Sequence, residues 1–206
     1  MKAIELTIKR SCGYKTYRVE IEEGSTTVLE ALQTIQSECD ETLAFRYGCR
    51  YRNCGLCGMK VNGNARMACM TKVRNGVVIE PLDNLPVIED LIVDRSMITN
   101  TIRKMKLFPK RTNDPPAPMS KEFETVSKCT ECQVCISGAP KFNDSPGPLF
   151  FVKLAQLYYH PHVDADYKQI AKALGIERFR NVEAIPCPYG IPIKKLAIDP
   201  FLKMMK

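Results

Sequence analysis

The chain has 206 residues, of which 45% are hydrophobic and 26% charged, and its formal net charge is +7. This balance is typical of one large or two small globular domains, and it excludes a disordered chain, a collagen-like fibre and a coiled-coil rod. No stretch approaches the ~18 apolar residues of a membrane-spanning helix, so we predict no direct membrane span.

The first residues, Met1-Lys2-Ala3-Ile4-Glu5, reach a charge before the apolar core of a signal peptide could form. We therefore expect a cytoplasmic protein that is peripheral to the cytoplasmic membrane only through its partners. In a reducing compartment, the ten cysteines are expected to be metal ligands or small buried side chains rather than disulfides.

The first half of the chain predicts a small α/β domain. Apolar and polar residues alternate over 4–8 and again over 17–21, which indicates two half-buried strands. Thr27 and Glu30 have the spacing of a capping box at the start of a helix. Val61-Asn62-Gly63 is typical of a hairpin turn, and residues 77–79 predict a closing strand. A hairpin, a helix, a cysteine-rich loop and closing strands together predict a β-grasp fold.

The first group of cysteines lies in this domain and consists of Cys49, Cys54, Cys57 and Cys69. The spacing C-x4-C-x2-C, with a fourth cysteine further on, is that of plant-type [2Fe-2S] ferredoxins. Neighbouring glycines let such a loop wrap closely around a cluster, and Arg50 and Arg52 would offset its negative charge. A zinc site is the alternative, but zinc usually takes two C-x2-C pairs and this group has one.

A proline-rich segment separates the two halves. Four prolines between residues 109 and 118 are incompatible with a helix interior or a central strand. We therefore predict a [2Fe-2S] ferredoxin domain at 1–100, a linker at 101–120 and a second domain at 121–206.

The second group of cysteines consists of Cys129, Cys132, Cys135 and the distant Cys187. The run C-x2-C-x2-C begins a bacterial ferredoxin motif whose next cysteine precedes a proline. Ala139 replaces that cysteine before Pro140, whereas Cys187 precedes Pro188 and can supply the fourth thiolate. The set predicts a [4Fe-4S] cluster, with a structural zinc as the alternative. Two clusters of about −2 each would leave a charge of about +3, which predicts no nucleic-acid partner.

The second half otherwise predicts helices, over 149–159 and 167–174, with Gly175 ending the latter. The predicted fold class is therefore α+β, a β-grasp ferredoxin domain followed by an all-α [4Fe-4S] ferredoxin-like domain. Cys12 and Cys39 lack a partner spacing and are interpreted as buried or incidental thiols. His160 and His162 are interpreted as surface or helix-end residues.

The two groups in this order resemble the iron–sulfur subunits of succinate dehydrogenases and fumarate reductases, over essentially the whole chain. The stretches that carry the resemblance are Phe45-Arg46-Tyr47-Gly48-Cys49-Arg50, Ala68-Cys69, Leu85-Pro86-Val87-Ile88-Glu89-Asp90 and Cys187-Pro188. The resemblance implies a non-catalytic electron-transfer subunit of an oxidoreductase complex. Its partner would be a flavoprotein subunit that holds FAD and acts on fumarate or succinate.

The chain departs from that family where electrons would leave it. The family's [3Fe-4S] ligands would fall at Ala139, Glu177 and Glu183, none of which is a cysteine. Its quinone-site tryptophan and histidine would fall near Asn143-Asp144 and at Arg178. We therefore expect electrons to pass between the [4Fe-4S] cluster and another redox protein, not a quinone. Similarity to the thiol-driven fumarate reductases of methanogens favours a heterodisulfide-reductase-like partner.

Two other hypotheses remain open at this point. One is a quinone-linked subunit with an altered electron exit, and the other is a zinc-stabilised structural or nucleic-acid adaptor. The x4 gap and the distant Cys-Pro pair argue against the adaptor.

Overall fold

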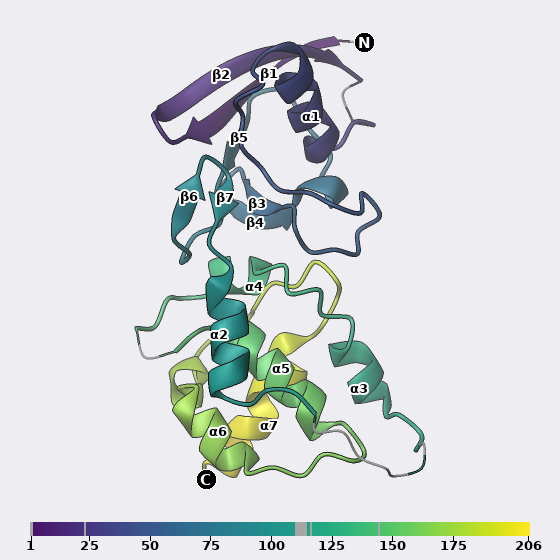
Figure 1. Cartoon of the computed structure of the whole chain (residues 1–206), viewed down its shortest axis with the longest axis vertical. Helices are drawn as coiled ribbons and strands as arrows, with labels where there is room; N and C mark the ends of the chain where they lie inside the picture. Colours follow the sequence, from purple (N-terminus) through teal and green to yellow (C-terminus); the bar gives the residue numbers. More distant parts are fainter. Residues whose placement is uncertain (1, 23, 110–114, 116, 144) are drawn as a thin grey trace. The chain divides into compact units, whose positions relative to one another are not determined.

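The computed structural model describes residues 2–22, 24–109, 115, 117–143 and 145–206. They form two compact units (Figure 1). Unit 1 comprises Met1–Asp94 with Cys132–Ser137, and unit 2 comprises Arg95–Glu131 with Gly138–Lys206.

Unit 1 is built on a mixed five-stranded sheet. Its strands are β1 (Lys2–Arg10), β2 (Gly13–Ile21), β3 (Gly58–Val61), β4 (Asn64–Met67) and β5 (Val77–Glu80), in the order β2-β1-β5-β3-β4. Strands β1 and β5 pair in parallel, and the other pairs are antiparallel. Ile4, Leu6 and Ile8 are fully buried, so the apolar positions of the predicted alternation do face the core. The turn between β3 and β4 has positive φ at Asn62 and Gly63 (48° and 74°), as a type I′ hairpin requires.

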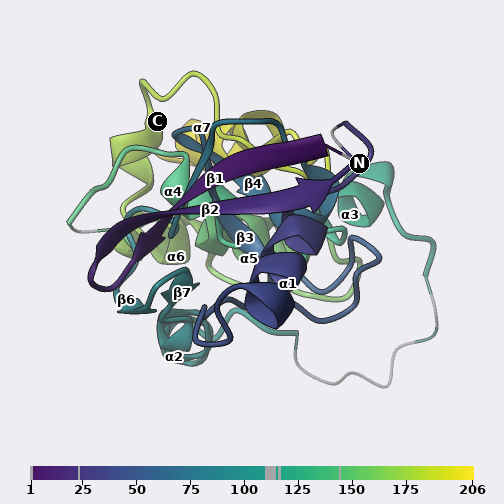
Figure 2. The same ribbon diagram turned by 90° about the horizontal axis from the view of Figure 1, so that it is seen from above.

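One helix, α1 (Val28–Glu38), covers the sheet of unit 1. The capping box is present: Thr27 Oγ1 accepts from Glu30 N–H at 3.2 Å, and the Glu30 carboxylate accepts from Thr27 N–H at 2.6 Å. Val28, Leu32 and Ile35 are fully buried on the helix face toward the sheet. Both views show α1 lying against the β1–β2 hairpin (Figures 1 and 2). This arrangement confirms the predicted strands and helix of the first domain.

The smaller elements of unit 1 are η1 (Ala68–Met70), the two-stranded hairpin of β6 (Val87–Glu89) and β7 (Ile92–Val93), and the short helix α4 (Val134–Ser137). Hydrogen bonds join α4 to the loop after β5. Ser137 Oγ accepts from Asp83 N–H at 2.8 Å, and the Ile136 carbonyl accepts from Asn84 Nδ2 at 3.0 Å.

The described part of unit 2 contains only helices as regular elements. They are α2 (Ser96–Lys104), α3 (Lys121–Val126), α5 (Pro148–Tyr158), α6 (Tyr167–Ala173), η2 (Ile176–Phe179), η3 (Lys194–Ile198) and α7 (Asp199–Met204). Phe150, Phe151, Phe179 and Phe201 are fully buried, and the rings of Phe151 and Phe179 meet edge to face at 5.2 Å. Gly175 follows α6 with φ 75°, the left-handed conformation of a helix C-terminus.

The predicted ranges 1–100, 101–120 and 121–206 differ from the compact units. Residues 101–104 belong to α2, because the first proline of the proline-rich segment comes only at residue 109. Residues 110–114 and 116 of the predicted linker lie outside the described residues. Over the described ranges, no helix combines the length and the apolar character needed to cross a bilayer.

Candidate iron–sulfur sites

The four cysteines of the first group all lie in unit 1. Cys49 and Cys54 lie in the irregular segment between α1 and β3, Cys57 directly precedes β3, and Cys69 lies in η1 after β4. The β3–β4 hairpin continues at this end, because the N–H of Ala68 donates to the Cys57 carbonyl at 2.9 Å. The sheet therefore brings the third and fourth cysteines together.

Backbone N–H groups of the loop converge on the sulfur of Cys49. Those of Tyr51, Asn53 and Cys54 donate to its Sγ at 3.3, 3.2 and 3.2 Å. Arg50 and Arg52 adopt left-handed backbone conformations, with φ 57° and 60°. N–H groups arranged by such turns form a concavity that attracts an anion. The loop is therefore shaped to hold a thiolate or a negatively charged cluster.

The four thiols are arranged as two pairs. The N–H of Cys49 donates to Cys54 Sγ at 3.5 Å, and the N–H of Cys69 donates to the sulfur of Cys57. A two-iron cluster takes two thiolates on each iron, whereas zinc takes four ligands around one point. The pairing fits a [2Fe-2S] cluster better than zinc.

Cys49 and Cys57, one from each pair, differ in how readily they ionise. The N–H groups of Asn53 and Tyr51 are the main causes that lower the pKa of Cys49 to about 7. Burial raises the pKa of Cys57, which is 2% exposed, to about 12. A buried thiol of this kind ionises only beside a positive charge, and iron supplies one. Bound iron would therefore favour the thiolate form of Cys57.

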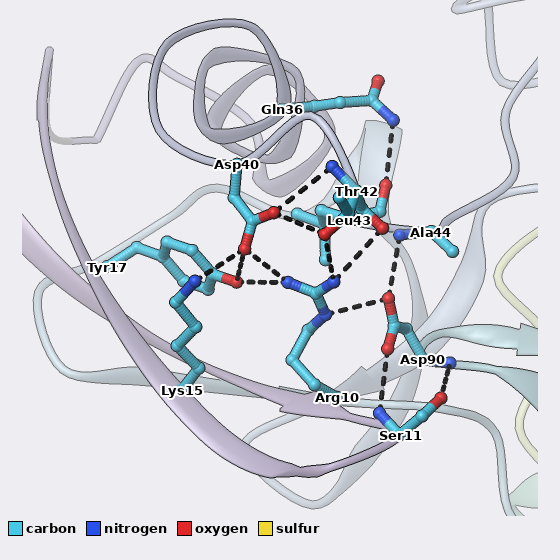
Figure 3. Close-up of polar contacts among 10 residues, drawn as sticks. All are labelled: Arg10, Ser11, Lys15, Tyr17, Gln36, Asp40, Thr42, Leu43, Ala44 and Asp90. Carbon is cyan, nitrogen blue, oxygen red and sulfur yellow. Dashed lines mark hydrogen bonds and ion pairs between the residues drawn. The ribbon is translucent and has the colours of Figure 1, made fainter.

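A buried polar network lies next to the segment that leads into this loop (Figure 3). Asp90, in the β6–β7 turn, is 3% exposed. Its carboxylate accepts from the N–H groups of Ser11 at 2.8 Å and Ala44 at 2.9 Å, and it pairs with Arg10 Nε at 2.8 Å. Arg10 also pairs with Asp40 at 2.7 Å. One guanidinium thus joins the β1–β2 turn, the residues after α1 and the β6–β7 turn.

The β6–β7 hairpin makes two further contacts with the same segment. The N–H of Leu91 donates to the Ala44 carbonyl at 3.2 Å, and Arg46 Nη1 donates to the Val93 carbonyl at 3.1 Å. These bonds and the Asp90 carboxylate fix residues 44–46, directly before the loop that begins at Gly48. Asp90 and Arg10 therefore position the start of the cluster loop, a role that the cysteine spacing gives no reason to expect.

The cysteines of the second group are divided between the units. Cys132 and Cys135 belong to unit 1, and Cys129 and Cys187 belong to unit 2. In unit 1, a Cβ atom at Gly58 would lie 2.8 Å from the Cys132 carbonyl oxygen, so only glycine fits there without a shift. In unit 2, burial is the main cause that raises the pKa of Cys129, the nearby Cys187 adds to it, and the Lys153 charge opposes it. The four-cysteine set itself stays a prediction.

The run 129–135 repeats two backbone features of the first loop. The N–H of Glu131 donates to the sulfur of Cys129, as that of Tyr51 does to Cys49. Glu131 and Gln133 have left-handed conformations, with φ 58° and 65°. Such conformations cost about 1–3 kcal/mol each in residues other than glycine and are kept mainly at functional sites. The second loop therefore shares with the first its left-handed residues and an N–H group directed at a cysteine sulfur.

The cysteine motif does not specify the residues between its cysteines, so it could not predict a role for two further side chains of this run. Thr130 Oγ1 and both polar atoms of Gln133 are buried and have no hydrogen-bond partner within the described residues. Gln133 is 0% exposed. Polar atoms are rarely buried in this way without a ligand or water to satisfy them, so the loop has the chemistry to contact a bound group.

The remaining predicted positions lie outside the two cysteine runs in the sequence. Ala139 is buried, whereas Glu177 and Glu183 are exposed, and Glu177 pairs with Arg180. Asn143 is exposed, and Asp144 lies outside the described residues.

The two cysteines outside the cluster motifs and the two histidines lie at the ends of regular elements. Cys12 and Cys39 are exposed, so the interpretation of these thiols as buried is wrong: one lies in the β1–β2 turn and the other at the end of α1, outside any core. His160 and His162 follow α5, and His160 Nδ1 accepts from the N–H of His162 at 3.2 Å, the local bond of a helix end.

Comparisons with known proteins relate this chain to iron–sulfur proteins. Residues 6–100 match the family model of a 2Fe-2S iron-sulfur cluster binding domain. An uncharacterized iron-sulfur protein of Methanocaldococcus jannaschii is 36% identical over 176 residues, which are 81% of this chain and 36% of that protein. A subunit of the fumarate reductase (CoM/CoB) of Methanothermobacter marburgensis is 37% identical over 68% of this chain and 30% of its own length. The chain thus spans about a third of the length of these two relatives.

Other relatives are closer in length. The fumarate reductase iron-sulfur subunit of Mycobacterium tuberculosis is 32% identical over 63% of each chain. A chain of the Mycobacterium smegmatis Sdh1 complex in the apo form has a TM-score of 0.86 and 25% identity, and the match covers 98% of this chain and 95% of that one. Together with the sheet of unit 1 and the helices of unit 2, these matches confirm the predicted α+β fold class.

Proposed function

We propose that this chain, a member of the iron–sulfur subunit family of succinate dehydrogenases and fumarate reductases, relays electrons between a flavoprotein and a second redox protein. The observation that carries the proposal is the first cysteine loop: two pairs of thiols, with N–H groups aimed at Cys49. The second loop repeats its backbone features. The chain itself would supply no catalytic residue.

The first cluster would be held by Cys49, Cys54, Cys57 and Cys69 as a [2Fe-2S] centre. When bound, such a cluster accepts and releases one electron at a time. The N–H groups of the loop would stabilise the charge on the sulfurs, and the Asp90 network would hold the loop in shape before the metal arrives.

The second cluster would be a [4Fe-4S] centre held by Cys129, Cys132, Cys135 and Cys187. Support comes from the motif, from the left-handed residues of the loop and from its unpartnered buried polar atoms. In unit 1, Gly58 follows one ligand of the first cluster, and a Cβ atom there would lie 2.8 Å from the Cys132 carbonyl oxygen, so the two loops pack closely. This short connection favours electron transfer between the clusters.

The flavoprotein partner, with its FAD, would dock on the first loop, at residues 48–58. Tyr51 is 87% exposed and Tyr47 is 37% exposed beside Arg50, whose guanidinium lies 5.4 Å from the Tyr47 ring. Exposed tyrosine and arginine side chains are typical of protein interfaces. Fumarate or succinate is the substrate we propose for that partner, since named relatives are fumarate reductase and succinate dehydrogenase subunits.

The second redox partner would be a heterodisulfide-reductase-like protein with iron–sulfur or thiol chemistry. One relative is a fumarate reductase subunit named for CoM and CoB, which supports a thiol-linked partner. This chain matches only 30% of that relative's length, so a second protein could supply the remainder here. The positions where related subunits would hold a [3Fe-4S] cluster are Ala139, Glu177 and Glu183. Two of them are exposed carboxylates, which suit a polar protein surface better than a buried quinone ring.

The complex purified anaerobically through this chain tests the proposal. We expect a flavoprotein to co-purify, and we expect fumarate reduction to be supported by thiol or reduced-protein donors but not by menaquinol or ubiquinol analogues. Rapid turnover with a quinol, blocked by quinone-site inhibitors, would instead support the quinone-linked alternative. A colourless protein that contains zinc would support a structural adaptor.

A further inference from the structure

Gln133 lies between two predicted cluster ligands in the sequence, Cys132 and Cys135, and its side chain is fully buried. It is 0% exposed, and neither its Nε2 nor its Oε1 has a hydrogen-bond partner within the described ranges. Buried carboxamides in native proteins are almost always hydrogen-bonded, and the exceptions call for a bound group. Asp90 is buried to a similar degree among the described residues, but its carboxylate is fully used by its neighbours.

The backbone of Gln133 is unusual in the same place. Its φ of 65° is in the left-handed region, which favours glycine or asparagine over a long side chain. The same run holds a second unpartnered buried oxygen, Thr130 Oγ1. Unpartnered buried polar atoms therefore occur at two positions of the loop 129–135, so they do not depend on the rotamer of Gln133 alone.

We propose that Gln133 Nε2 donates a hydrogen bond to a sulfur of the [4Fe-4S] cluster held by Cys129, Cys132, Cys135 and Cys187, and so raises its reduction potential. The inference rests on the proposed function. A carboxamide has two N–H donors, and cluster sulfurs are acceptors.

The sign of the effect follows from charge. Reduction adds one electron to the cluster, supplied by the second redox protein in the complex and by dithionite in the titration, and makes its sulfurs more negative. A donated N–H stabilises the more negative state, so the donor raises the potential. No bond is broken, and the proton stays on Nε2 in both redox states.

The test is a redox titration of the anaerobic holo-protein with dithionite, followed by EPR. In Gln133→Leu, which keeps the bulk and removes the donor, we expect the ratio of reduced to oxidised cubane at a fixed potential to fall about tenfold, or ~59 mV for one electron. The [2Fe-2S] midpoint should not move. The matched control is Gln36→Leu, because Gln36 Nε2 already donates to the Leu43 carbonyl at 2.8 Å; neither midpoint should move there.

Two outcomes overturn the inference. If Gln133→Leu keeps its cubane and the midpoint of that cluster equals the wild-type value, the hydrogen bond is absent, although the proposed function stands. If the wild-type protein holds no cubane, the proposed function fails as well.

If Gln133→Leu loses its cubane, its midpoint cannot be measured. A measurement on the wild-type protein then tests the hydrogen bond. Pulsed EPR of reduced protein with 15N in the glutamine side chains should give a nitrogen coupling to the cubane, and its absence overturns the inference. Gln133→Glu, which keeps the length of the side chain but has no nitrogen, should lose the coupling.

Discussion

The substitution Asp90→Asn tests the network that positions the first cluster loop. Asp90 is 3% exposed and accepts two backbone N–H bonds besides its ion pair with Arg10, whose side chain is 11% exposed. Asparagine keeps the shape and one acceptor oxygen, but it removes the charge and turns an NH2 group toward the N–H and guanidinium donors.

The magnitude follows from the burial of the pair. Removing one partner of a buried ion pair costs about 3–5 kcal/mol, and Arg10 keeps some contact with solvent and with Asp40, so the lower end, about 3 kcal/mol, applies. For a unit of this size, each kcal/mol lowers the melting temperature by about 4 °C, which gives about 12 °C. Since residues 44–46 lose an anchor, iron should also leave the [2Fe-2S] site faster.

Thermal unfolding by circular dichroism, with bleaching at visible wavelengths for the cluster, measures both effects. The matched control is Asp83→Asn, because Asp83 is 53% exposed and pairs with Lys60 at 3.1 Å; an exposed pair of this kind contributes only about 0–1 kcal/mol. If the two variants melt within 2–3 °C of each other, a spread of about 0.5 kcal/mol, the network does not hold the loop.

The same variant has a predicted pH dependence. Burial raises the pKa of Asp90, but the N–H groups of Ala44 and Ser11 and the Arg10 charge outweigh it, and the net pKa is lowered. A carboxyl with a lowered folded-state pKa stabilises the fold fully above its unfolded value of about 4, and that stability is lost as the pH falls through the folded value. The difference between wild type and Asp90→Asn should therefore be constant above about pH 4 and shrink below it. A difference that grows in acid would contradict this sign.

Four further substitutions test single features. Cys69→Ala should abolish the [2Fe-2S] EPR signal and spare the [4Fe-4S] signal, and Cys187→Ala should do the reverse; a full cubane in Cys187→Ala would disprove its role as the fourth ligand. Gly58→Ala places a Cβ 2.8 Å from the Cys132 carbonyl and should cost about 1–3 kcal/mol in denaturant titration, whereas an unchanged midpoint would mean that the two loops separate easily. Thr27→Ala removes a capping box and should cost about 1 kcal/mol, with no change in either cluster; a loss below about 0.3 kcal/mol would show that α1 depends on burial alone.

Local patterns were enough to predict most of unit 1. The alternation at Ile4, Leu6 and Ile8 and the capping box at Thr27 are consequences of backbone geometry within a few residues. Asn62-Gly63 likewise specifies its own turn. The cysteine spacing predicted the loops because ligand geometry constrains the chain between ligands.

Long-range features could not be predicted in this way. Asp90 meets Ser11 across 79 positions of sequence, and no local pattern distinguishes it from an exposed aspartate. Helix α2 extends into the predicted linker because a proline-rich composition marks the prolines themselves and not the residues before them. The burial of Gln133 depends on how the chain folds around a seven-residue run whose intervening positions the motif leaves open.

The central claim is that this one chain holds a [2Fe-2S] and a [4Fe-4S] cluster and no third. Mössbauer spectroscopy of anaerobically purified protein enriched in 57Fe measures it most directly. We predict about six irons per chain, about one third of them in a [2Fe-2S] component and two thirds in a [4Fe-4S] component. A stoichiometric [3Fe-4S] component, or a spectrum with no cubane at all, would contradict the account.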